Sequence, residues 1–144
     1  MANSSKQPIT IEATIKAPIE IVWDLWVQPE HIVKWNNASD DWHTPKATNN
    51  LKVGGKFSAT MAAKDGSMSF DFEGTYSKVV EYQQIAYTIA DGREVSVIFS
   101  ADAEDDEITK VVETFEPEGT NPIEMQRQGW QAILNNFKKY VEEN

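Results

Sequence analysis

The chain has 144 residues, 40% hydrophobic and 25% charged, a balance typical of one globular domain spanning residues 1–144. The formal net charge of −10 argues against nucleic acid and anionic membranes as partners, since both favour a basic protein surface. The absence of cysteine excludes disulfides and thiolate chemistry, and with neither a hydrophobic signal peptide nor a membrane-length apolar run we expect a cytoplasmic location.

The N-terminal part predicts one strand followed by two short helices. Residues 9–16 alternate apolar and polar side chains, which is typical of a strand packed on one side. Pro18 suits the first turn of a helix, and the apolar residues between 19 and 26 then share one helical face. Pro29 ends this helix and begins a second one over residues 29–35.

The middle of the chain has the pattern of short strands joined by tight turns. A polar stretch contains a short predicted strand around residues 42–47, and the glycine pair at 54–55 permits a bend before the next strand. Asp65-Gly66 and Asp91-Gly92 are typical hairpin turns, which require antiparallel neighbours. The remaining predicted strands cover residues 57–61, 68–76, 82–89, 95–99 and 108–116.

The chain closes with one long amphipathic helix. Asn121 is a suitable capping residue, Pro122 fits the first turn, and Glu124 stands at the capping-box position. The apolar side chains that follow at helical spacing are Trp130, Ile133, Leu134, Phe137, Tyr140 and Val141. This order of elements predicts an α+β fold in which a curved antiparallel sheet of about six or seven strands packs around the C-terminal helix. A hollow remains between sheet and helix, closed at one end by the two short helices.

Several short motifs carry a family resemblance that extends from about residue 9 to residue 141. They are Ala17-Pro18, Val22-Trp23, Gln28-Pro29-Glu30, Trp35, Val53-Gly54-Gly55, Gly74-Thr75-Tyr76, and Gly129-Trp130 with Leu134. Their order and spacing resemble the START-like (SRPBCC) superfamily, within it the group related to the activator of the ninety-kilodalton heat-shock protein ATPase. The resemblance implies a helix-grip fold whose cavity, in many relatives, takes lipids, polyketides or other apolar molecules.

Two departures separate this chain from the pattern it resembles. Asn36 stands where the family often has a second tryptophan after Trp35. The founding cochaperone also carries a separate N-terminal chaperone-binding domain, which we expect this chain to lack.

The predicted hollow is the candidate site. Tryptophans this dense fill a core or line a cavity, and binding cavities are mostly apolar. On the last strand, the alternation leaves open whether Glu113 or Lys110 faces inward; a buried Glu113 would have a raised pKa. The predicted lining comprises Trp26, Trp35, Trp42, Phe57, Met61, Phe70, Phe72, Phe99, Glu113, Met125, Gln126, Trp130, Leu134 and Phe137.

These observations predict binding of an apolar or amphipathic small molecule in the hollow. Two alternatives stay open: a polyketide cyclase-like or hydrolase-like enzyme that uses the same cavity, and a chaperone-interacting module. An inward polar group with a shifted pKa favours the enzyme, and an exposed apolar patch favours the interaction module. We predict no catalytic residue, metal site or cofactor; the sequence leaves the oligomeric state open, a homodimer included.

Overall fold

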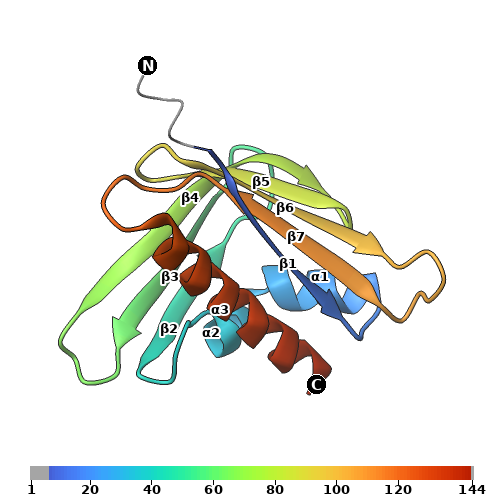
Figure 1. Ribbon diagram of the computed structural model, residues 1–144, viewed down its shortest axis with the longest axis horizontal. Helices are drawn as coiled ribbons and strands as arrows, with labels where there is room; N and C mark the ends of the chain where they lie inside the picture. The colour runs from blue at the N-terminus through green and yellow to red at the C-terminus, as the bar shows by residue number, and fades with distance from the viewer. Residues whose placement is uncertain (1–6, 144) are drawn as a thin grey trace.

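A computed structural model describes residues 7–143 of the chain (Figure 1). Its elements are β1 (Ile9–Ile15), α1 (Ile19–Val27), α2 (Pro29–Trp35), β2 (Trp42–Asn49), β3 (Lys56–Ala63), β4 (Ser69–Val80), β5 (Gln84–Ile89), β6 (Glu94–Ala101), β7 (Thr109–Phe115) and α3 (Ile123–Glu142). The strands form one antiparallel sheet in the order β1-β7-β6-β5-β4-β3-β2. The predicted α+β helix-grip architecture is confirmed.

The sheet curls because its apolar residues occupy one face. In β1, inward Ile9, Ile11, Ala13 and Ile15 are buried and the residues between them are exposed. Register shifts interrupt β2 and the twelve-residue β4, and such bulges increase local twist and bend a strand. The outcome is a concave apolar face and a convex polar one.

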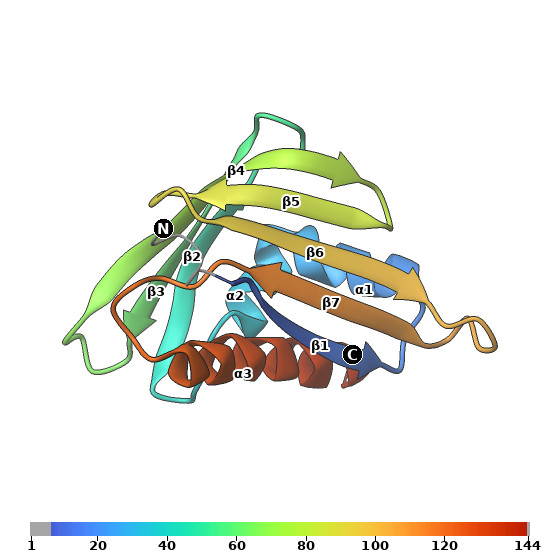
Figure 2. The ribbon, with the colours of Figure 1, turned by 45° about the horizontal axis from the view of Figure 1, so that its top comes forward.

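The helices close the concave face unevenly. Helices α1 and α2 carry the chain from edge strand β1 to the opposite edge strand β2, and they close one end of the curved sheet (Figures 1 and 2). Figure 2 shows α3 lying across the open side, next to β1. Because α3 stays beside β1, the concave face of β3, β4 and β5 is not covered to the same extent.

Three aromatic rings hold the helices together. Trp26 of α1, Trp35 of α2 and Phe137 of α3 form a cluster with ring centroids 4.8–5.0 Å apart. The indole nitrogen of Trp35 donates to the carbonyl oxygen of Leu25 at 2.9 Å, and the side-chain amide of Asn136 donates to the Trp35 carbonyl oxygen at 2.7 Å. Each polar atom of this junction therefore has a partner, as burial requires.

The start of α3 differs from the predicted capping box. Pro122 is the N-cap residue, and no side chain caps the helix. Asn121 instead donates its backbone and side-chain N–H groups to the Glu118 carboxylate. The Asn121 side chain is therefore bound to Glu118 in the preceding loop and does not cap α3.

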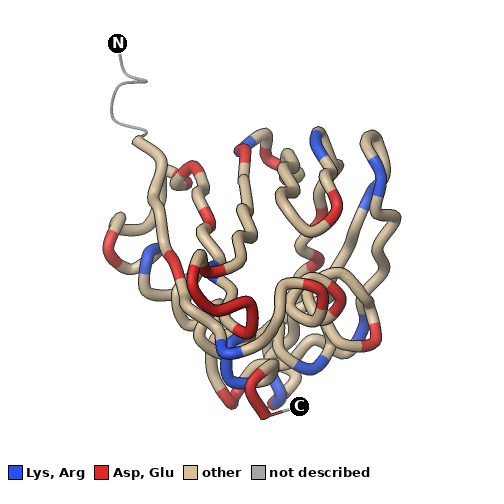
Figure 3. Tube along the Cα trace, turned by 90° about the vertical axis from the view of Figure 1, so that its right-hand side faces the viewer, with Lys and Arg blue, Asp and Glu red and all other residues tan. Residues whose placement is uncertain are grey.

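The loop between β6 and β7 carries a cluster of acidic residues. Figure 3 shows the β6–β7 loop, residues 102–107, as an acidic loop facing the viewer.

No helix within residues 7–143 is both long and apolar enough to cross a membrane.

Gly129 lies in the middle of α3 with open space around the position of a Cβ atom. A helical glycine costs about 1 kcal/mol relative to alanine, so we expect Gly129→Ala to raise the free energy of unfolding by about 0.5–1 kcal/mol. Urea unfolding followed by circular dichroism measures the change.

Gly55→Ala is the matched control, because a Cβ there would lie 2.1 Å from the carbonyl oxygen of Asn50. That variant should lose stability. A Gly129→Ala protein that is less stable than the parent would show that α3 packs more tightly at this position than the structure indicates.

Candidate functional site

A cavity of about 320 Å³ lies between the concave face of the sheet and the three helices. Apolar and aromatic side chains from β3, β4 and β5 form one wall, and Trp26, Trp35, Trp130 and Ile133 from the helices form the other. Phe70 lines the cavity and is 50% exposed, so the cavity opens to solvent at the β3–β4 side.

Most of the predicted site residues line this cavity. They come from α1, α2, β3, β4, β7 and α3, which are far apart in the sequence. They are Trp26, Trp35, Phe57, Met61, Phe70, Phe72, Glu113, Gln126 and Trp130. Whether they contact a ligand stays a prediction.

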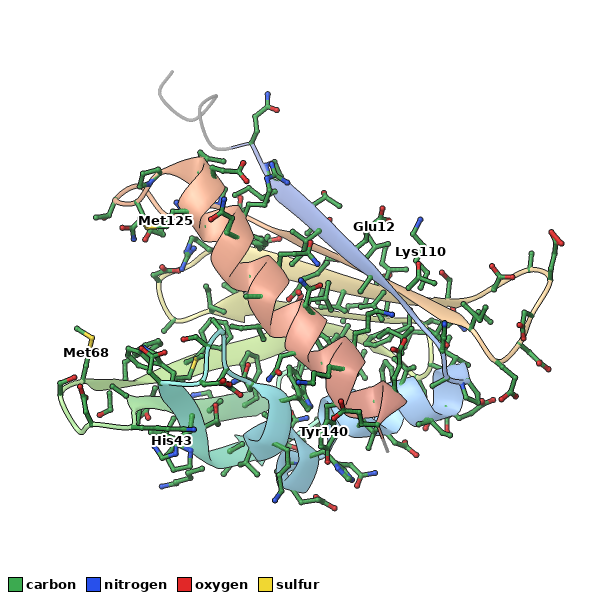
Figure 4. The ribbon with its side chains drawn as sticks, turned by 60° about the horizontal axis from the view of Figure 1, so that its bottom comes forward. Glu12, His43, Met68, Lys110, Met125 and Tyr140 are labelled. Carbon is green, nitrogen blue, oxygen red and sulfur yellow. The ribbon has the colours of Figure 1, made fainter. Side chains whose placement is uncertain are left out.

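The other predicted residues lie elsewhere. Phe99, Leu134 and Phe137 face inward but are at most 3% exposed, because neighbouring side chains of the core cover them. Trp42 packs against Phe70 with ring centroids 6.0 Å apart, outside the cavity lining. Met125 is 58% exposed and points away from the fold (Figure 4). One residue along a helix is a rotation of about 100°, which is why Met125 faces solvent while Gln126 is buried.

The sequence prediction missed two tyrosines. Tyr76 of β4 and Tyr87 of β5 are buried and line the cavity. Burial raises the pKa of Tyr76 to about 12, and its hydroxyl donates to Oδ1 of Asn49 at 2.7 Å. Tyr87 alternates with Ile85 and Ile89, and this period of two was the available signal for its inward orientation.

Glu113, not Lys110, faces the cavity. Glu113 is 6% exposed and lines the cavity from β7. Lys110 points outward from the same strand, where its amino group lies 3.0 Å from the Glu12 carboxylate of β1 (Figure 4). The two positions are three residues apart, so the alternation of a strand places them on opposite faces.

The Glu113 carboxyl group is buried without a partner. It makes no hydrogen bond or ion pair with any residue in the described range 7–143. Burial raises its pKa from 4.5 to about 8, because a low-dielectric surrounding disfavours the charged form. Burial, and second the Glu113 charge, raise the pKa of Tyr87 as well.

Two further polar side chains of the lining, Gln126 and Arg93, are engaged in structural contacts. The Gln126 side chain accepts from the backbone N–H of Glu118 at 2.8 Å and donates to the Asn121 carbonyl oxygen at 2.8 Å. Arg93 donates from Nε to Asp91 at 2.8 Å and from Nη1 to the Glu116 carbonyl oxygen at 3.2 Å. Gln126 and Arg93 therefore hold the loops at the cavity edge.

The histidines stand apart from the cavity. His43 is exposed on the outer side of β2 (Figure 4), and His31 Nδ1 lies 2.7 Å from the Tyr140 hydroxyl between α2 and α3. Within the described residues, no group of three or more His, Asp or Glu side chains is placed to hold a metal ion.

Comparison with known proteins places the fold among close relatives. The sequence family described as "Activator of Hsp90 ATPase homolog 1-like protein" matches residues 16–142. The solution structure of an AHSA1-like protein from Aeromonas hydrophila is 46% identical with a TM-score of 0.88, covering 95% of this chain and 93% of that one. A solution structure from Cytophaga hutchinsonii is 55% identical with a TM-score of 0.80, covering 94% and 92%.

More distant structures share the fold alone. A crystal structure from Nitrosomonas europaea has a TM-score of 0.81 at 15% identity, covering 96% of both chains. The comparison with curated proteins found no significant match.

The buried carboxyl group predicts a pH-dependent stability. Because the folded-state pKa of Glu113 is raised from 4.5 to about 8, the folded protein holds a proton that the unfolded chain has released in this window. The free energy of unfolding contributed by Glu113 therefore falls as pH rises from 4.5 through 8. The glutamine of the Glu113→Gln variant cannot ionise. The free energy of unfolding of the variant, relative to that of the parent, should therefore rise by about 1.4 kcal/mol for each pH unit between 4.5 and 8.

Urea unfolding at pH 5.5, 7 and 9 measures this difference. Glu12→Gln is the control, since Glu12 is exposed on the convex face and should show no comparable trend. Parallel stability curves for the parent and Glu113→Gln would mean that Glu113 is solvated in solution.

Proposed function

The chain belongs to the family of Activator of Hsp90 ATPase homolog 1-like proteins, and we propose that it binds an apolar or amphipathic small molecule in the cavity beneath α3. The observation that carries the proposal is the cavity itself, with its aromatic walls and the buried Glu113 carboxyl group, which has no hydrogen-bond partner among residues 7–143. Small-molecule sites typically have about 300–1,000 Å³, mostly apolar walls and a few polar groups that orient the ligand. A cavity of about 320 Å³ lies at the lower end of that range and suits a compact ligand.

The aromatic lining supplies the driving force in this proposal. Trp130 stacks on Phe115 at 3.9 Å, so its remaining surface is available toward the cavity, where Phe72 meets it edge-on at 6.1 Å. Removing apolar surface from water contributes about 25 cal/mol per Å², so a ligand that buries about 200 Å² gains about 5 kcal/mol before binding costs.

One observation also supports an enzyme that uses the same cavity. Glu113 is buried and its pKa of about 8 lies near neutrality, where a carboxyl group can both donate and accept a proton. Among the described residues, however, no histidine lines the cavity beside it. We therefore rank acid–base catalysis second, as a proposal that requires turnover of a bound compound and its loss in Glu113→Gln.

A neutral fluorescent probe tests the binding proposal. N-phenyl-1-naphthylamine should gain emission on entering the cavity and quench the tryptophans that line it. Ala59→Leu should weaken binding about tenfold or more, because Ala59 is 5% exposed and lines the cavity, so that a larger side chain takes the ligand's space.

Ala101→Leu is the matched control, since Ala101 is exposed at the end of β6. It should bind the probe as the parent does. No response of the parent protein to the probe, or equal binding by Ala59→Leu, would contradict the proposal.

A further inference from the structure

Glu113 is a buried residue of the cavity lining that makes no hydrogen bond or ion pair within residues 7–143. Its neighbours in the sheet are Ile11 of β1 and Val97 of β6, both buried and apolar. Every fully occluded side-chain polar atom within residues 7–143 has a hydrogen-bond partner, yet Glu113 has none. Its carboxylate oxygens therefore face the open space of the cavity, where a ligand group can reach them.

The described residues of the cavity lining supply no counter-charge to this carboxylate. Arg93 is the one cationic side chain of the described cavity lining, and it is already bound to Asp91 and to the Glu116 carbonyl oxygen. A second carboxylate, Glu118, lies at the cavity edge. With a formal net charge of −10, the whole molecule attracts cations and repels anions.

The rings around the cavity also favour positive charge. Phe57 contacts both tyrosines of the lining, with ring centroids 4.7 Å from Tyr87 and 5.4 Å from Tyr76. Aromatic faces carry partial negative charge and attract ammonium groups, most strongly where water is excluded. A carboxylate ligand would meet neither a free cation nor a favourable ring face here.

We infer that the cavity is selective for an apolar ammonium compound, whose cationic group lies against the Glu113 carboxylate and the surrounding rings while its hydrocarbon part fills the aromatic pocket. This inference rests on the proposed binding function and names its ligand class. It predicts that a positive charge on the ligand increases affinity, whereas a negative charge lowers it.

The ligand charge couples binding to pH. Burial raises the pKa of Glu113 to about 8, so the group is mostly protonated at pH 7 and must lose its proton to pair with a cation. Apparent affinity for the cation therefore falls about tenfold for each pH unit below 8. The other titratable groups of the lining are Tyr76 and Tyr87, whose pKa values are raised so that they stay neutral, with Arg93 and Glu118 at the edge. The α1, α2 and α3 side chains that line the cavity carry no titratable group.

Two probes of the same shape separate charge from size. Benzyltrimethylammonium has a permanent positive charge, and neopentylbenzene is its neutral carbon isostere. Each displaces N-phenyl-1-naphthylamine, and the displacement gives its affinity at pH 6 and pH 9. At pH 9 the ammonium compound should bind about tenfold or more tightly than the isostere. At pH 6 its affinity should fall by about 100-fold, with the isostere unchanged.

Glu113→Gln keeps the shape of the side chain and removes its charge. In this variant the ammonium compound should lose its pH dependence and most of its preference over the isostere, whereas the control Glu12→Gln on the convex face should behave as the parent. Equal or tighter binding of neopentylbenzene at pH 9, or an unchanged preference in Glu113→Gln, overturns the inference while leaving the binding function intact. Failure of N-phenyl-1-naphthylamine itself to bind overturns the proposed function, and the inference with it.

Discussion

The fold depends on the contact of Trp26, Trp35 and Phe137, which joins the three helices at one end of the curved sheet. This cluster fixes the C-terminal half of α3, and the stacking of Trp130 on Phe115 at 3.9 Å fixes the N-terminal half. A helix is stiff between two such points, and Trp130 and Phe137 are about 10 Å apart along its axis. Because α3 is held at both points, it cannot pack directly against β3, β4 and β5, and the cavity remains between them.

The same geometry explains why a carboxyl group stands inside the fold. An apolar residue at position 113 would match its buried neighbours Ile11 and Val97 and would avoid the cost of desolvating an acid. Glu113 thus lowers stability at neutral and alkaline pH and supports no structural contact in the described chain. A destabilising polar group that faces a cavity is typical of functional sites, where side chains with perturbed pKa values are frequent. By contrast, Gln126 is buried at the cavity edge and satisfies all its contacts within the loop before α3.

The fold leaves a mostly apolar cavity between the sheet and α3, and the family description does not say what the cavity holds. The aromatic walls make the cavity apolar, and the proposed preference for a cationic ligand depends on how charged groups are distributed around it. Arg93 and Glu118 lie at the edge, and Glu113 lies against the apolar strands. Arg93 and Glu118 are partly exposed, so water screens their charges, whereas the Glu113 carboxyl group is 6% exposed and is screened much less.

Local pattern was enough to predict the elements. The alternation of β1 and the helical spacing of α3 are properties of neighbouring residues, and the proline and glycine signals marked α2 and the hairpin turns. The same local rules were wrong at Asn121. Its side chain bonds Glu118, which lies outside the helix, instead of capping α3. Periodicity also predicted many of the residues that line the cavity, because it identifies which side chains face inward.

Periodicity could not decide which inward side chains remain uncovered. Phe57 and Phe99 both face inward from their strands, but Trp23 and Trp26 cover Phe99 while Phe57 borders the cavity. On β7, a period of two fits either Glu113 or Lys110 as the inward residue, and only pairing with β1 and β6 selected Glu113. The sequence by itself determined the strands, the helices and the apolar character of the interior. The tertiary structure alone decided the position of the cavity and its unpaired carboxylate, because both depend on how far a rigid helix stands from a curved sheet.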